Sequence, residues 1–134
     1  MYDFFKNIAE ENDWGFQYAR KDYLNLSADD VNPNQVQMFL EPITTDSSFS
    51  ETGRESKTYN GNMLLLMASD VDEDYDAKYQ TYIKPLIDVA KTLITDSFSC
   101  SDYEIKNLKT IEVINIFDGN LDGLFITYLI ALID

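Results

Sequence analysis

One stretch near the middle of the chain has the periodicity of an amphipathic helix, and it constrains the fold more than any other feature. Between residues 79 and 94, apolar residues recur at intervals of three and four, which places them on one helical face. The members of this stripe are Tyr79, Tyr82, Ile83, Leu86, Ile87, Ala90, Leu93 and Ile94. Pro85 falls inside the pattern, so we expect the helix either to kink there or to begin just before it.

Alternating and continuous apolar runs on both sides of this helix predict β-strands. Extended segments are expected at residues 16–18, 23–26, 35–40, 58–68 and 124–133, and at residues 103–106 and 110–117 with a break near Asn107. The segment Met63–Met67 is continuously apolar, which predicts burial on both faces of a sheet. The final strand is apolar on both faces and contains no charge. Residues 2–12 have the spacing of a short amphipathic helix. The order α-β-β-β-α-β-β predicts an α+β fold, with a mainly antiparallel sheet and both helices packed on it.

The length of the chain, 134 residues, favours a single domain spanning residues 1–134. Within it, residues 44–57 are almost wholly polar. A connection of this length exceeds the usual hairpin loop, and long loops are commonly functional or mobile. The sequence therefore predicts a long polar loop at about 44–57.

The charge of the chain restricts its partners. It has 24 acidic and 10 basic residues, which give a formal net charge of −14. Such a surface repels phosphate backbones and anionic lipid headgroups, so we expect neither specific nucleic-acid binding nor membrane binding. We expect no targeting segment, because residues 1–6 lack a basic region followed by a long apolar run, and no apolar stretch of the sequence is long enough to span a bilayer. We therefore expect a soluble protein that is made in the cytoplasm.

The absence of histidine and the presence of one cysteine remove several classes of active site. Without histidine there is no imidazole base and no imidazole ligand. Cys100 has no such base to activate it, so we expect a small, partly buried residue that follows the helix. The sequence thus predicts neither an enzyme nor a bound cofactor.

The pattern Asp118-x-Asn120-x-Asp122-Gly123 matches the first half of an EF-hand calcium loop. The twelfth position of that loop requires a bidentate glutamate, and this chain has Leu129 there. Asp, Asn and Gly are also the residues that β-hairpin turns favour. A turn is therefore the preferred interpretation, and Asp118, Asn120 and Asp122 stay as candidate metal ligands.

A second acidic run precedes the long helix. It consists of Asp70, Asp72, Glu73, Asp74 and Asp76. Acidic residues stabilise the N-terminus of a following helix, and runs of like charge usually stay solvated. An alternative is an acidic surface that faces a polyanion without binding it.

The order of elements and the segment INIFDGNLDG at residues 114–123, which leads into an apolar strand, resemble small phage structural proteins of the tail-terminator or head–tail joining kind. The stretch NIFDGNLDGLFITY is also similar to proteins of crAss-like gut phages. The resemblance implies a neck ring of six or twelve copies between portal and tail, with sheets around a channel through which DNA leaves. It implies no catalytic residues.

The resemblance also assigns roles to the two polar segments. Ser47, Phe49 and Arg54 become candidate subunit-interface residues, and the acidic run at residues 70–76 becomes an acidic surface or lumen that repels DNA. The expected location is the virion, and the expected partners are copies of this chain and other neck or tail proteins. Two other interpretations stay open. One is an acidic DNA mimic, and the other is a calcium-dependent interaction protein built on Asp118, Asn120 and Asp122.

Overall fold

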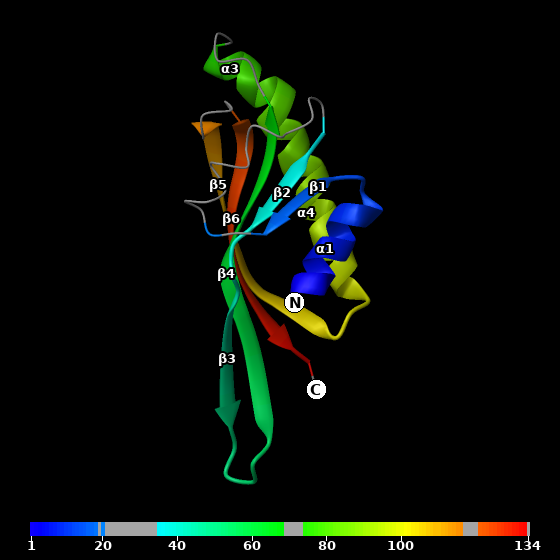
Figure 1. Cartoon of the computed structure of the whole chain (residues 1–134), viewed down its shortest axis with the longest axis vertical. Coiled ribbons are helices and arrows are strands. Elements are labelled where there is room, and N and C mark those ends of the chain that lie inside the picture. Colours follow the sequence, from blue (N-terminus) through cyan, green and yellow to red (C-terminus); the bar gives the residue numbers. More distant parts are fainter. Residues whose placement is uncertain (19, 21–34, 69–73, 117–120, 134) are drawn as a thin grey trace.

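Ten helical and strand segments make up the computed structural model, which describes residues 1–18, 20, 35–68, 74–116 and 121–133. In chain order they are α1 (Tyr2–Glu11), β1 (Gly15–Tyr18), β2 (Gln37–Leu40), β3 (Thr44–Phe49), β4 (Glu55–Ala68), α3 (Tyr75–Lys78), the π-helical segment η2 (Tyr79–Ile83), α4 (Lys84–Ser99), β5 (Tyr103–Ile116) and β6 (Leu121–Leu132). Helices α1 and α4 lie side by side against one face of the sheet (Figure 1).

The described part of the chain forms one sheet of six strands. Five of them lie in the order β1-β2-β4-β6-β5, and β3 pairs with β4 outside this path. Only β1 and β2 run parallel among these pairs, and the others are antiparallel. Strand β4 pairs with β6 along its whole second half and most of its first. On its other side, β4 pairs first with β3 and then with β2. The α+β class and the mainly antiparallel sheet are thus confirmed.

Side chains are buried on both faces of the central strands. On the helix-bearing face, Phe5 of α1 and Phe98 of α4 belong to one cluster with Met63 of β4 and Tyr128 of β6. On the opposite face, a second cluster contains Phe39, Leu64, Leu66 and Leu121, each with no exposed surface. The predicted burial of the Met63–Met67 segment on both sides is confirmed, because Met63 to Leu66 are fully buried.

The predicted helix is longer than its apolar stripe. Segments α3, η2 and α4 follow one another without a break from Tyr75 to Ser99. Asp74 caps this helix, because its carboxylate accepts a hydrogen bond from the Ala77 backbone N–H at 2.7 Å. Pro85 lies in the first turn of α4, directly after the π-helical segment. The π-helical turn therefore lies just before Pro85, whose nitrogen has no hydrogen to donate to the preceding turn.

One prediction of local structure is wrong. Residues 44–57 are a β-hairpin and not a loop, since all six residues of β3 pair in register with Glu55–Asn60. These residues are polar because both faces of the hairpin contact solvent, and a strand in such a position needs no apolar face. Residues 103–106 and 110–117, expected to be extended with a break near Asn107, belong to one strand, β5, which has a β-bulge between Ile105 and Asn107. The predicted strand at 23–26 and most of the turn at 118–123 lie outside the described residues.

Gly123 lies where the backbones of two central strands come too close for a side chain. It pairs with Leu66 of β4 and Val113 of β5, and a Cβ atom here would overlap the carbonyl oxygen of Leu65. The obstacle is the backbone of a central strand, which cannot move away as the end of a side chain could. Glycine is therefore required at this position, where β6 pairs with β4.

We predict that Gly123→Ala lowers the free energy of unfolding by about 3 kcal/mol, because β4 and β6 must separate locally. Gly53→Asn is the matched control. Gly53 lies in the hairpin tip with φ +83 and has no atom within 4 Å of its Cβ position, and asparagine tolerates that conformation. Urea unfolding of both variants measures the difference, and equal stabilities would contradict the assignment.

Candidate functional site

Residues 44–57 form a projecting hairpin that we call the arm. Strand β3 and the first residues of β4 extend past the ends of β5 and β6 (Figure 1). Pairing between β4 and β6 begins only at Thr58, so Glu55–Lys57 pair with β3 alone among the described strands. Every residue of β3 is exposed. The arm is therefore ordered structure that contributes nothing to either core cluster.

The tip of the arm is held by short-range hydrogen bonds. The Ser50 backbone N–H donates to the Arg54 carbonyl at 2.9 Å, and the Gly53 N–H donates to the Ser50 carbonyl at 2.9 Å. The Arg54 N–H also donates to the Ser50 hydroxyl oxygen at 3.1 Å. These contacts close the turn, and the positive φ of Gly53 provides the reversal that L residues rarely adopt.

Phe49 is the most solvent-exposed large apolar residue described, with 67% of its surface accessible. It lies at the end of β3, opposite Glu55. The Ser47 hydroxyl, on the same side of the strand, donates to the Glu55 carboxylate at 2.8 Å. The three predicted interface residues thus lie together on the arm: Ser47 and Phe49 on β3, and Arg54 in the tip. Burial of one exposed phenylalanine side chain in an interface contributes about 2 kcal/mol to the free energy of association.

The outer edge of β5 is the longest open strand edge in the described part of the chain. Strand β5 has 14 residues and forms one end of the sheet. Its charged residues and its bulge are the devices that natural proteins place on exposed edges. Glu104 and Lys106 form an exposed ion pair at 2.9 Å. The stretch from Ile105 to Ile111 contains two lysines, Lys106 and Lys109, and no acidic residue.

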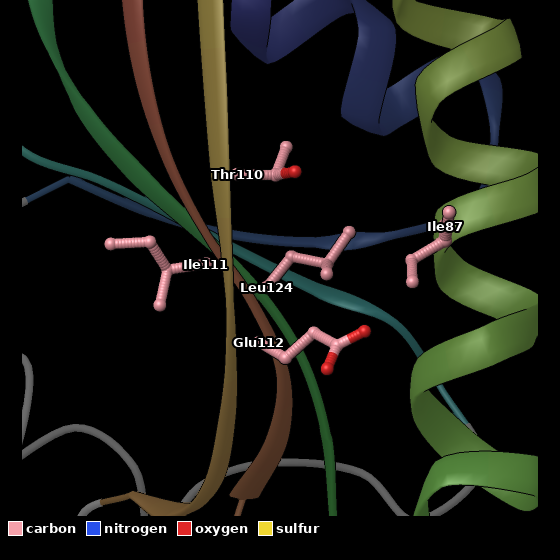
Figure 2. A pocket seen from close by; sticks show the side chains of 5 residues that line it. All are labelled: Ile87, Thr110, Ile111, Glu112 and Leu124. Atoms are coloured by element: carbon pink, nitrogen blue, oxygen red, sulfur yellow. The ribbon is translucent and has the colours of Figure 1, made fainter.

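Helix α4 leaves the helix-facing side of β5 partly open. Figure 2 shows Thr110, Glu112 and Leu124 directed toward Ile87 of α4, with Ile111 directed away. These five residues line a hollow of about 350 Å³. A second hollow of about 470 Å³, which we call the C-terminal hollow, is lined by Thr95, Phe98, Ser99, Ser101, Tyr103, Glu104, Ile105 and Ile133. Both hollows lie between α4 and the edge strand.

Asp122 has a role different from the one its motif suggests. It lies in strand β6, fully buried, and its Oδ2 is 3.2 Å from the Nζ atom of Lys78, which is also fully buried. A cation at Asp122 would have to compete with this lysine. The other candidate ligands, Asp118 and Asn120, lie outside the described residues. Within the described ranges, no three His, Cys, Asp or Glu side chains are placed to share a metal ion.

We predict that Lys78→Met and Asp122→Asn each lower the free energy of unfolding by about 3–5 kcal/mol, because each removes one partner of a buried ion pair. In the double variant, the decrease in the free energy of unfolding should be smaller than the sum of the two single decreases, because neither the lysine nor the aspartate is then buried without its partner. Urea unfolding of the four proteins measures this coupling. Strictly additive losses would show that the two side chains act independently.

Tyr128 places a further polar group, its hydroxyl, in the core. Its hydroxyl has no hydrogen-bond partner among the described residues, and the ring lies over Gly61, where a Cβ atom would be 2.7 Å from that hydroxyl. Burial raises the pKa of Tyr128 well above the ordinary tyrosine value, and the nearby charges of Tyr18 and Glu41 add to this. The folded protein therefore keeps this phenol protonated in strongly alkaline solution.

We predict that stability falls above about pH 10, the ordinary pKa of tyrosine, because the unfolded chain then releases a proton that folded Tyr128 retains. Below that pH the two states bind the proton equally and the full stability is present. Tyr128→Phe should leave stability at pH 7 nearly unchanged and reduce the alkaline loss by up to about 1.4 kcal/mol per pH unit. Urea unfolding at pH 7 and pH 11 tests this, and equal alkaline losses in both proteins would refute it.

The remaining predicted residues are dispersed. Asp74 and Asp76 are exposed at the start of the long helix, and Asp70, Asp72 and Glu73 lie outside the described residues. Cys100 follows α4 as predicted, but it is exposed and not partly buried. No described helix has the length and apolar character needed to cross a membrane.

Comparison of the chain with protein-family models and with curated proteins finds no match. The candidate site therefore rests on the geometry of the arm, the edge of β5 and the adjoining hollows.

Proposed function

We propose that this protein is a structural subunit that assembles with copies of itself into a ring, in the neck or tail of a phage virion. The observation that carries the proposal is the arm, an ordered hairpin with the exposed side chain of Phe49 near its tip. An isolated two-stranded hairpin is only marginally stable in water. Contact with a second copy would bury Phe49 and stabilise the arm.

The open edge of β5 supports assembly from the other side of the subunit. A long exposed edge presents unpaired backbone donors and acceptors, which another strand can satisfy. The arm and this edge are different surfaces, so a contact between them is heterologous, and such contacts generate rings when the rotation closes. The ring of six or twelve copies is the arrangement that the sequence resemblance implies.

The net charge of the chain supports a role in which the protein lies next to DNA without binding the DNA. A net charge of −14 repels phosphates, which suits a channel through which a genome passes. On the helix layer, exposed acidic residues include Asp3, Glu10, Asp88 and Asp96. The proposed protein is therefore a non-enzymatic virion component, made in the host cytoplasm, with neighbouring neck or tail proteins as further partners.

We predict that shortening the arm abolishes assembly and preserves the fold. The variant replaces Ser47–Lys57 by Asn-Gly, so that Asp46 and Thr58, which are paired in the hairpin, are joined by a two-residue turn. Its melting temperature should stay close to that of the wild type, since the deleted residues touch neither core cluster. Native mass at several concentrations and negative-stain imaging should show rings for the wild type and monomers for the variant.

Thr52→Ala is the control for this experiment, because it alters the tip and leaves the arm intact. Rings formed by the shortened variant would remove the arm from the interface. A wild-type protein that stays monomeric at every concentration would contradict self-assembly, and the DNA-mimic interpretation would then be tested by capture on basic DNA-binding proteins.

A further inference from the structure

The directions of the four strands beside the arm determine how two copies can join. At the base of the arm, where Thr44–Asp46 pair with Thr58–Asn60, the strands lie in the order β3-β4-β6-β5, and each runs antiparallel to its neighbour. Strands β3 and β5 therefore run in opposite directions at the two edges. A second copy in the same orientation, placed beside β3, presents its β5 antiparallel to β3, with the helices of both copies on the same side.

The faces of the sheet also match in this arrangement. Asp46 is opposite Thr58, Thr58 is opposite Ala131, and Lys109 is opposite Thr127. Paired residues share a face and side chains alternate along a strand. Asp46 and Lys109 therefore lie on the same, helix-free face of the sheet.

The charges of the two edges are complementary. Asp46 is the one charged residue of β3, and the Asn60 side-chain amide donates to its carboxylate at 3.2 Å. Lys109 is exposed in the regular part of β5, beyond the bulge, in a stretch that has no acidic residue. Opposite charges directly across an antiparallel pair are favourable, and like charges are unfavourable. In a chain of net charge −14, this lysine-bearing edge is suited to an acidic strand of a second copy.

We propose that β3 of one copy adds to the β5 edge of the next in antiparallel register, with Asp46 opposite Lys109 of the partner copy. This inference rests on the proposed function and deepens it. The register places Phe49 opposite Lys106, on the helix-bearing face, since it lies three residues from Asp46. There Phe49 adjoins the C-terminal hollow with Phe98, Ile105 and Ile133, of which Ile133 is 51% exposed.

The pairing gives a continuous antiparallel sheet that runs from copy to copy. Backbone hydrogen bonds supply affinity, and the two side-chain contacts specify the register. A symmetric contact between two β5 edges is the competing arrangement, and it would give a closed dimer with the arms left exposed.

Charge reversal in trans tests the proposal. Asp46→Lys alone places two lysines opposite each other, and Lys109→Asp alone places two carboxylates opposite each other. Each variant should assemble at least about tenfold more weakly than the wild type, with an unchanged melting temperature because both positions are exposed. An equimolar mixture of the two single variants should restore rings, since every interface of an alternating ring then has one lysine and one aspartate.

Lys106→Asp is the matched control, because it makes the same charge change on the same strand three residues away. Its mixture with Asp46→Lys should give no rescue. Rings from each single variant at wild-type concentrations would overturn the register and leave ring formation standing. A wild-type mass fixed at the dimer and insensitive to Asp46→Lys would overturn the pairing in favour of the β5–β5 contact. A wild-type monomer at all concentrations would overturn the proposed function and this inference together.

Discussion

The fold depends on one strand, β4, that serves two different parts of the molecule. Its second half is buried on both faces, from Met63 to Leu66, and pairs with β2 and β6. Its first half, from Glu55, leaves the core and pairs with β3 to make the arm. Because strands are continuous and stiff over many residues, the direction in which the core holds β4 also sets the direction of the arm. The arm is thus placed by the core even though it adds nothing to the core.

A buried ion pair joins the long helix to the sheet at the other end of β4. Lys78 of α3 and Asp122 of β6 have no exposed side-chain surface and lie 3.2 Å apart. Removing two charges from water is costly, so such a pair adds little net stability compared with apolar residues. The ion pair instead specifies the register of β6, because a shift of this strand would separate Asp122 from Lys78 and leave a buried charge without its partner. Beside this ion pair, the lack of a side chain at Gly123 allows the backbones of β4 and β6 to approach closely.

The sequence predicts elements whose side chains show a period, and it fails where periodicity is absent. The stripe from Tyr79 to Ile94 predicted the long helix because one face of that helix is buried. Residues 44–57 were expected to be a loop because both faces of the hairpin contact water, so no alternation exists to detect. The pairing of Lys78 with Asp122 depends on a strand register 44 residues away, which local patterns do not contain.

The sequence marked Phe49 as a candidate interface residue, but the edge that we propose as its partner surface could be identified only from the order of strands in the sheet. Copies of a chain with net charge −14 repel one another, so attraction has to be local. At physiological salt, charges more than about 8 Å apart are largely screened, whereas a contact pair keeps much of its interaction. Backbone hydrogen bonds between strand edges do not depend on net charge, and Lys109 lies on the stretch of β5 that lacks acids. The proposed contact through this edge is therefore compatible with the strongly acidic composition of the chain.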